Sequence, residues 1–340
     1  MTSRDAVDDV RVAAVVVTYN RKELLMECLE ALLRQTRPLQ AIYIIDNAST
    51  DGTPELLHRE GYTPSLEGGT VTRKNLHNQE EIRITHIRLP ENTGGAGGFH
   101  EGVKRAYHDG YDWIWLMDDD AEPLPDSLKI LLPYISKKVS ALCSAVVKIN
   151  GEIDLNQRGN NNTKFPSKYF PVPKDKYRSK CVRIDVATFV GILINSKKIS
   201  EVGFPRKEFF IHQDDTEYSL RLRKVGDILL VPSSIFIHKE SGRKTVKRKI
   251  FNKKSERTPY ENFWIRYYGI RNSLIVSRTY SSGFNFYFEY LKMLILICLG
   301  ILIFDDRKLK RIELIITAFL DGLKENFDNE KAKKMLYADK

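Results

Sequence analysis

The chain has 340 residues, a net charge of +10 and four cysteines. This length allows one large domain or two smaller ones, and the positive charge favours anionic partners such as a nucleotide, phosphate, anionic lipid or nucleic acid. Cys28, Cys143, Cys181 and Cys298 form no CxxC pair, which argues against a zinc site or a disulfide framework and indicates free thiols in a reducing compartment. The polar first residues contain no apolar signal core, so we expect a cytoplasmic protein.

Strand-like and helix-like segments alternate through the first 120 residues. Continuous apolar runs predict strands at 12–18, 41–46, 82–89 and 113–117. Helical spacing predicts helices between them, at 22–33, 53–60 and 96–109. This alternation indicates an α/β fold with a central, mostly parallel sheet that is covered on both faces. In such sheets ligands bind beyond the carboxyl ends of the strands.

The next segments are more varied. Residues 61–81 read as a polar insertion without a clear period, and residues 150–182 as a long surface excursion. The remaining pattern predicts helices at 125–134 and 214–224 and strands at 140–149, 183–195 and 227–231. From residue 259 onward the pattern becomes helical. We therefore expect a first domain at 1–258 and a C-terminal helical region at 259–340, which associates with a membrane or with a second copy.

The C-terminal region contains the most apolar stretch of the chain, at 293–304. It has twelve residues, or seventeen when counted from residue 288, whereas a transmembrane helix needs about twenty. We expect a buried or interfacial helix; a short segment that dips into the membrane is the alternative. The flanking cations Arg307, Lys308, Lys310 and Arg311 suit an anionic membrane surface. A packing face within the chain or between copies is the competing interpretation.

The run at 113–120, WIWLMDDD, ends in Asp118, Asp119 and Asp120. Three clustered carboxylates repel one another unless a cation neutralises them. A divalent metal that also binds a phosphate-bearing substrate would do so. The alternative is a solvated acidic turn that caps the next helix.

Two other strands also end in polar residues. Thr18 and Asn20 follow the first strand, and Asp46 and Asn47 follow the second. Asp46 can accept a hydrogen bond from a base imide or a ribose hydroxyl, whereas the turn through residue 52 also suits helix capping. Three polar clusters at three strand ends predict one shared site.

These motifs carry a family resemblance. VVVTYNR at 15–21, IIDNASTDGT at 44–53 and WLMDDD at 115–120 occur in an order and spacing that resemble the inverting family 2 glycosyltransferases of the GT-A fold. The resemblance covers about residues 10–240. It implies a nucleotide-sugar donor, with Thr18, Asn20 and Asp46 near the nucleoside and Asn47 as a further substrate contact.

A glycine-rich segment narrows the resemblance. NTGGAGGFHEGVKRA at 92–106 allows close approach of the backbone to a ligand, just before a helix start that favours anions. Together with WxWxxDDD it looks like the galactofuranosyltransferase and rhamnosyltransferase branch. We expect substrate contacts from Asn92, Gly94, Gly95 and Gly98.

The resemblance also implies a metal site. The Asp-x-Asp pattern of the family maps onto Asp118 and Asp120, with Asp119 between them as a substrate contact. Asp120 is the expected direct ligand, and Asp118 contacts ribose or metal. Related galactofuranosyltransferases use a histidine at the position of His238 as a third ligand, and imidazole favours Mn²⁺ over Mg²⁺. The alternative is an ordinary surface or core histidine.

A second acidic cluster occupies 214–217. An inverting transferase needs a general base for the acceptor hydroxyl, and the resemblance places it in this Asp-Asp-x-Glu motif. We assign the base to Asp215, acceptor binding to Asp214 and an orienting role to Glu217. The alternative for Asp214 is helix N-capping.

Two basic segments follow. Residues 243–257 contain eight basic residues against one glutamate, which suits a solvated loop, a lid over the diphosphate, or a surface facing anionic lipid. Residues 263–276 contain a Tyr-Tyr-x-x-Arg-Asn segment that family members share, and we interpret it as a structural helix lining the acceptor channel. Aromatic and arginine interleaving also occurs in binders of single-stranded nucleic acid, but no RNA-binding motif accompanies it.

The sequence thus predicts a transfer of galactofuranose from UDP-galactofuranose to a glycan or lipid-linked glycan, in cell-surface polysaccharide synthesis. The predicted location is peripheral, at the inner face of the cell membrane. The rival enzyme is a rhamnosyltransferase using dTDP-rhamnose. The non-enzymatic rival is a nucleotide- or nucleic-acid-binding module, and nucleic acid is not an expected partner. A homo-oligomer is compatible with these features.

Overall fold

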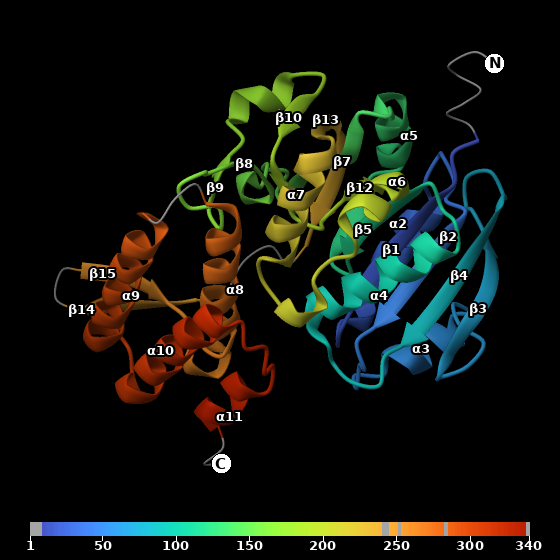
Figure 1. Ribbon diagram of the computed structural model, residues 1–340. Helices are drawn as coiled ribbons and strands as arrows, with labels where there is room; N and C mark the ends of the chain where they lie inside the picture. The colour runs from blue at the N-terminus through green and yellow to red at the C-terminus, as the bar shows by residue number, and fades with distance from the viewer. Residues whose placement is uncertain (1–8, 240–244, 251–252, 282–284, 338–340) are drawn as a thin grey trace. The chain divides into compact units, whose positions relative to one another are not determined.

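The computed structural model describes residues 9–239, 245–250, 253–281 and 285–337 (Figure 1). The chain divides into two compact units. The first comprises Met1–Asn160, Phe170–Lys207 and Asp215–Ser241, and the second comprises Asn161–Tyr169, Glu208–Asp214 and Gly242–Lys340. The second unit thus takes in two short segments from the middle of the chain.

A mixed sheet of ten strands, counted in the described part of the chain, forms the first unit. The strands are β1 Val12–Thr18, β2 Ala41–Asp46, β3 Gly68–Lys74, β4 Glu81–Arg88, β5 Trp113–Asp118, β6 Ala121–Pro123, β7 Val139–Lys148, β10 Val182–Ile184, β12 Ile192–Asn195 and β13 Asp227–His238. Their order is β10–β13–β7–β12–β5–β1–β2–β4–β3, with β6 paired to β13. Strands β5, β1, β2 and β4 run parallel, as do β7 and β13.

Helices cover both faces of this sheet, as the alternating pattern predicts. They are α2 Lys22–Leu33, α3 Thr53–Arg59, α4 Gly94–His108, α5 Ser127–Leu131, α6 Ser196–Val202 and α7 Asp214–Val225, with a 3₁₀ turn at Leu132–Tyr134. Strand β1 shows why it is apolar throughout. Its even-numbered residues pack with α2, α3 and α5, and its odd-numbered residues pack with α4, α6 and α7. Every residue of β1 is buried.

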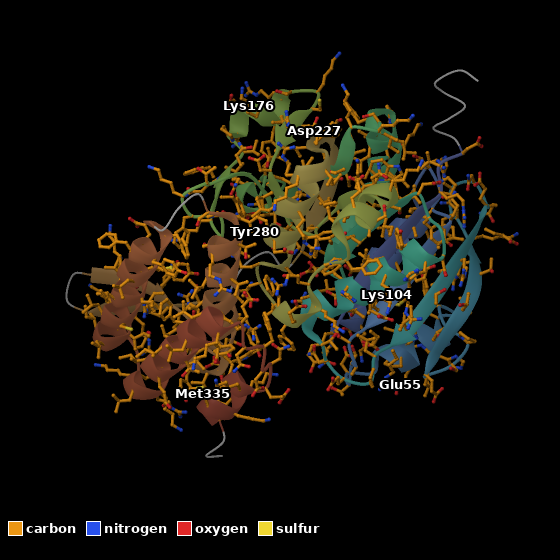
Figure 2. All side chains as sticks on the ribbon, in the orientation of Figure 1. Glu55, Lys104, Lys176, Asp227, Tyr280 and Met335 are labelled. Atoms are coloured by element: carbon orange, nitrogen blue, oxygen red, sulfur yellow. The ribbon has the colours of Figure 1, made fainter. Side chains whose placement is uncertain are left out.

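The predicted surface excursion at 150–182 contains regular structure. It holds β8 Arg158–Asn161 and β9 Tyr169–Pro171, which join β11 Val186–Ala187 in a small three-stranded sheet. Short 3₁₀ helices lie at Leu155–Gln157 and Lys174–Arg178. The exposed side chain of Lys176, labelled in Figure 2, belongs to the second of these.

The second unit is mainly helical. Its elements are the hairpin β14 Val246–Ile250 and β15 Lys253–Arg257, a 3₁₀ helix at Tyr260–Asn262, and the helices α8 Ile265–Tyr280, α9 Asn285–Phe304, α10 Lys308–Lys324 and α11 Lys331–Tyr337. Helix α10 packs on α8, α9 and α11. Their shared core includes Tyr267, Tyr268, Ile301, Leu314 and Ala318.

The structure corrects several sequence predictions. The polar insertion at 61–81 contains β3, an edge strand paired only with β4. The single strand predicted at 183–195 is three short strands, because β11 leaves the main sheet. The described part of the basic run, for which no strand was predicted, is the β14–β15 hairpin. Residues 240–244 and 251–252 lie outside the described residues. The apolar C-terminal helix has 20 residues and is not buried along its whole circumference.

Candidate active site

The carboxyl ends of β1, β2 and β5 meet at one edge of the sheet. In the strand register Thr18 pairs with Asp46, and Val17 pairs with Asp118. Because the three strands are parallel, the polar residues that follow them lie at the same edge. The structure therefore brings the three predicted clusters together.

A hydrogen-bond network surrounds the acidic run. Thr18 donates from Oγ1 to Asp119 Oδ2 at 2.7 Å. The Arg21 guanidinium donates from Nη1 to Asp119 Oδ1 at 3.2 Å and to Asp120 Oδ2 at 2.9 Å. The sequence interpretation assigned all the neutralisation to a metal and overlooked Arg21. The position of Arg21, a basic residue shortly after the first strand, could have indicated a partner for these carboxylates.

Arg21 leaves part of the negative charge uncompensated. Burial raises the pKa of Asp118 to about 7, and repulsion from Asp120 and Asp119 adds to this effect. Burial also raises the pKa of Asp119 to about 6, although Arg21 and Thr18 oppose the shift. A carboxyl group whose pKa rises in this way favours any added positive charge nearby.

Asp120 lies against His238. The antiparallel pairing of β13 with β6 places His238 opposite Ala121, and His238 Nε2 lies 3.2 Å from Asp120 Oδ1. Burial alone would disfavour charge on either group, but their contact outweighs it, so the pKa of Asp120 is lowered and that of His238 is raised.

The Asp120–His238 contact fits a cation. Asp120 Oδ1, which faces His238 Nε2, and His238 Nδ1, the other ring nitrogen, are both buried and have no hydrogen-bond partner among the described residues. A carboxylate and an imidazole that lie side by side in this way suit a metal such as Mn²⁺. Across the described chain no three His, Cys, Asp or Glu side chains form a complete metal cluster. Water and substrate oxygens would have to supply the other positions, as in open catalytic sites.

Asp46 is fully buried at the end of β2. Its Oδ1 accepts a hydrogen bond from Ser49 N at 2.8 Å, and its Oδ2 lies 3.8 Å from His86 Nε2. Burial disfavours the charged form of Asp46, but His86 and Ser49 outweigh it and lower its pKa. The sequence analysis missed His86, although it occupies the inward position of the alternating strand β4, after Ile82 and Ile84.

Asn20 and Asn47 hold the loops around this edge. Asn20 has a left-handed backbone (φ 55°), and its Oδ1 accepts from Thr50 N at 2.7 Å. Asn47 donates from Nδ2 to Gly94 O at 2.8 Å and accepts at Oδ1 from Thr93 N and Oγ1. Both residues thus support the backbone, and their predicted substrate contacts stay predictions.

The glycine-rich segment at 92–106 lets α4 pack closely on β1 and also leaves open space beside its backbone. Gly94 begins α4 with φ 72°, and its N–H donates to Asn92 Oδ1 at 2.8 Å. A Cβ atom on Gly98 would lie 2.5 Å from Val17 Cγ1, so glycine lets α4 pack onto β1. A Cβ on Gly95 would meet nothing within 4 Å. Among the glycines predicted to let a ligand approach the backbone, Gly95 faces open space. At Gly98 a glycine is needed because a side chain would collide with Val17 of β1.

The second acidic cluster begins α7. Asp214 is buried, and Asp215 Oδ1 accepts from Thr216 N at 2.6 Å. Burial raises the pKa of Asp215, although its hydrogen bonds with Thr216 and the charge of Arg158 partly oppose the shift. No contact recorded in the described structure joins Asp215 directly to the Asp118–Asp120 cluster, so the shared catalytic role of these groups stays a prediction.

Glu217 has a clear structural partner. It accepts from Arg221 Nε at 3.0 Å and from Nη2 at 2.8 Å. Arg221 also donates to Val202 O and Phe204 O. The Glu217–Arg221 pair therefore ties α7 to the end of α6.

A strained loop precedes Asp214. Phe210, His212 and Gln213 have φ of 64°, 69° and 69°, in the left-handed region that non-glycine residues rarely adopt. Asn272 Nδ2 donates to three carbonyl oxygens of this loop, at 2.9 Å to Phe209, 3.0 Å to Ile211 and 2.9 Å to His212. One buried side chain thus holds the loop in its strained form.

Arg271 and Asn272 together hold this loop, and we call the pair the loop anchor. It donates from Nε to Asn272 Oδ1 at 2.9 Å and from Nη2 to the carbonyls of Glu208 and Phe209 at 3.2 Å. Its guanidinium lies over the rings of Tyr267 and Tyr268. The Tyr-Tyr-x-x-Arg-Asn segment, predicted to line an acceptor channel, thus holds the loop that leads into Asp214 and Asp215.

A family model matches the part of the chain that carries the clusters after β1, β2 and β5. Residues 13–202 fit the model for glycosyl transferase family 2, and the chain belongs to this family. The galactofuranosyltransferase GlfT1 of Mycolicibacterium smegmatis is 28% identical over 227 residues, 63% of this chain and 66% of that relative. The chain thus spans just under two thirds of this curated relative. An uncharacterized glycosyltransferase of Haemophilus influenzae is 29% identical over 115 residues, 34% of this chain and 36% of that protein.

Solved structures share the fold. GalNAc-T7 with UDP, GalNAc and Mn²⁺ aligns with a TM-score of 0.57 and 15% identity, covering 95% of this chain and 57% of that one. A mannosyltransferase from Pyrobaculum calidifontis in complex with GDP-Man and Mn²⁺ aligns with a TM-score of 0.50 and 15% identity, covering 98% and 80%. These likenesses, with the sheet described above, confirm the predicted GT-A fold.

The loop anchor makes a prediction for stability. Asn272→Ala removes the shared donor of three carbonyls and leaves those of Ile211 and His212 without it in a partly buried place, whereas Phe209 keeps its bond from Arg271, so we expect the free energy of unfolding to fall by about 2 to 4 kcal/mol. Urea denaturation measures this loss. Asn78→Ala is the matched control, because Asn78 is exposed and its side chain bonds to Glu80, two residues away. Equal stability of the Asn272 and Asn78 variants would contradict the anchor.

Proposed function

We propose that the chain transfers galactofuranose from UDP-galactofuranose to a glycan, with inversion at the anomeric carbon. The observation that carries the proposal is the cluster of Asp118, Asp119, Asp120 and His238 at the sheet edge where nucleotide ligands bind in α/β folds. Membership of glycosyl transferase family 2 supports the reaction class. The similarity to the galactofuranosyltransferase GlfT1 supports the choice of sugar.

The donor nucleotide would bind at the ends of β1 and β2. Asp46 and Thr18 are adjacent in the register, and one carboxylate oxygen of Asp46 has no hydrogen-bond partner within the described part of the chain. This atom, Oδ2, lies 3.8 Å from His86 Nε2, and an anionic acceptor of this kind suits the imide N–H of a uracil or a ribose hydroxyl. Asn92, Gly94 and Gly95 would contact the sugar or diphosphate at the start of α4.

Asp120 and His238 would hold a divalent cation, with Mn²⁺ favoured because an imidazole is present. Such a cation stabilises negative charge on the departing nucleotide diphosphate. Asp118 would contact the ribose or the same cation, and Arg21 keeps Asp119 and Asp120 in place. The Mn²⁺ complexes among fold relatives support a metal of this kind.

Asp215 would act as the general base. Its carboxylate takes the proton of the acceptor hydroxyl while that oxygen attacks the anomeric carbon and the bond to UDP breaks. Because burial raises its pKa, Asp215 is a stronger base than an exposed aspartate. Asp214 would bind acceptor hydroxyls. One displacement of this kind inverts the anomeric centre.

The acceptor would be a growing cell-surface glycan carried on a lipid. The net charge of +10 and the apolar, partly exposed α9 support a peripheral position at the cytoplasmic face of the membrane. Self-association through the second unit is the competing use of the same surface.

The donor prediction separates this function from its rival. Purified chain with Mn²⁺ is incubated with UDP-galactofuranose, UDP-galactopyranose or dTDP-rhamnose, and nucleotide release is measured. We expect release from UDP-galactofuranose alone, and its loss when EDTA removes the cation. UDP, but not dTDP, should raise the melting temperature, because a selective ligand stabilises the folded state. Consumption of dTDP-rhamnose would establish the rhamnosyltransferase instead.

The base assignment makes a second prediction. Asp215→Asn keeps the shape of the side chain but cannot take a proton, so we expect kcat to fall by about 10² to 10⁴ while UDP binding is unchanged. Asp175→Asn, at an exposed aspartate of the same unit, should leave both unchanged. Full turnover by the Asp215 variant would show that another group is the base.

The metal assignment makes a third prediction. His238→Gln removes one of two converging ligands, so the Kd for Mn²⁺ should rise by roughly tenfold or more. Asp120 is already ionised near neutral pH because its pKa is lowered, whereas His238, whose pKa is raised, must lose its proton to bind the cation, so the wild-type affinity should fall between pH 8 and pH 6. Electron paramagnetic resonance of free Mn²⁺ measures both effects. His77→Gln, at an exposed histidine, is the control, and equal affinity of the two variants would exclude His238 from the metal site.

A further inference from the structure

Helix α9 exposes an apolar stripe along its whole length. Phe288, Leu291, Ile295, Leu296, Leu299, Leu302 and Ile303 are between 47% and 70% exposed. They recur at intervals of three or four residues, so they share one face. A helix on the surface of a soluble domain carries polar residues on such a face. Large exposed apolar patches mark an interaction surface.

The opposite face of α9 is buried in the second unit. Phe286 and Tyr290 pack with Phe165 and Leu274, and Ile301 packs with the α8–α10 core. Tyr290 also hydrogen-bonds through its hydroxyl to Ser273 on α8. By length and composition α9 could cross a membrane. A crossing helix would have to leave these contacts, so the structure favours a helix that lies flat.

Cations gather beside the carboxyl-terminal end of this stripe. The hairpin exposes Lys247, Arg248, Lys249 and Lys254. Its last residue, Arg257, binds Asp305 at 2.9 Å and 2.6 Å, and Arg257 Nη1 would lie 2.9 Å from a Cβ on Gly300. Strand β14 also contacts α9. The basic hairpin is therefore seated on α9.

The start of α10 adds further exposed cations and further exposed apolar side chains. Arg307 and Lys308 are exposed, and Leu309 is 83% exposed between cations. Further along α10, Ile316 and Leu320 are exposed at the spacing that places them on the Leu309 side. Apolar side chains beside lysine and arginine complement a bilayer that presents acyl chains and anionic headgroups together.

We propose that α9, the β14–β15 hairpin and the start of α10 form a surface that lies in the plane of an anionic bilayer. The apolar stripe of α9 enters the headgroup boundary, and the cations of the hairpin contact anionic headgroups. This inference deepens the proposed function by naming the surface that meets the lipid carrying the acceptor. Vesicle binding needs no sugar transfer, so the two proposals can fail separately.

The test uses the full chain and sucrose-loaded vesicles of phosphatidylcholine, with or without phosphatidylglycerol. We expect cosedimentation with anionic vesicles that weakens as salt increases. Ile295→Gln/Leu296→Gln/Leu299→Gln changes only exposed side chains and should lower vesicle partitioning by roughly tenfold or more. Lys247→Ser/Lys249→Ser should lower it by roughly fivefold per cation.

Matched controls carry the same changes elsewhere. Leu66→Gln/Leu76→Gln removes exposed leucines of the first unit, and Lys137→Ser/Lys138→Ser removes two exposed lysines there. Both controls should bind vesicles like the wild type. Nucleotide release from UDP-galactofuranose in vesicle-free buffer should be equal in all variants. If the wild type releases no nucleotide from UDP-galactofuranose, this result counts against the proposed function but does not affect the conclusion from vesicle binding.

Three results would overturn the membrane surface. The first is equal vesicle binding by the wild type and both α9 and hairpin variants. The second is a dimer in solution that the triple glutamine variant converts to a monomer, without vesicle binding, since the stripe is then an interface between copies. The third is resistance of the native membrane-bound chain to extraction by alkaline carbonate, since a flat-lying helix is released whereas a spanning helix stays.

Discussion

The repulsion among three adjacent carboxylates at the end of β5 is the constraint on which the candidate site depends. Asp118, Asp119 and Asp120 are held close by the strand, so the surroundings must supply positive charge or protons. Arg21 and Thr18 satisfy Asp119, and His238 meets Asp120. The groups that compensate the charge come from β1, the start of α2 and the end of β13. Strand β1 is the neighbour of β5 in the sheet, and β13 reaches the cluster through β6, the short strand that follows Asp120.

Backbone strain is the second constraint. Asn20, Ala48, Phe210, His212 and Gln213 all have positive φ, and they lie in the loops after β1 and β2 and before α7. Each such residue raises the energy of the folded state, so buried polar side chains must hold the loop. Asp46 and Asn272 do this by bonding to backbone groups. Loops fixed in this way present side chains in one geometry, which catalytic positioning needs.

Sequence alone predicted the elements whose signal is local. The bounds of β1, α2 and β2 match the predicted ones, because strands buried on both faces are apolar throughout and α2 has clear helical spacing. Strand β3 was missed because Thr70, Thr72 and the charged residues around them suit an edge that is half exposed. The basic hairpin was missed for the same reason, since lysines on edge strands hide the strand pattern.

Contacts between segments that are distant in the chain could not be predicted from the sequence. Nothing near Asn272 indicates that its amide will meet carbonyls about sixty residues earlier, and a motif shared with a family does not reveal the contact. His86 differs, because a histidine in the inward series of a strand already predicts a buried polar group. Helix α9 was judged too short to cross a membrane because the apolar count began at residue 293 or 288, whereas the helix begins at Asn285.

One turn of α8 links two of these features. Arg271 and Asn272 hold the strained loop before Asp214, and the next residue, Ser273, bonds to Tyr290 on the buried face of α9. Helix α8 therefore holds the loop before Asp214 and also contacts the buried face of α9, the helix that carries the apolar stripe. The Ser273–Tyr290 contact gives the loop and α9 one shared support. In the proposed membrane-bound state the exposed stripe of α9 faces the lipid while its inner face stays fixed to α8, so α9 can lie on a bilayer without releasing the loop that leads into the proposed base.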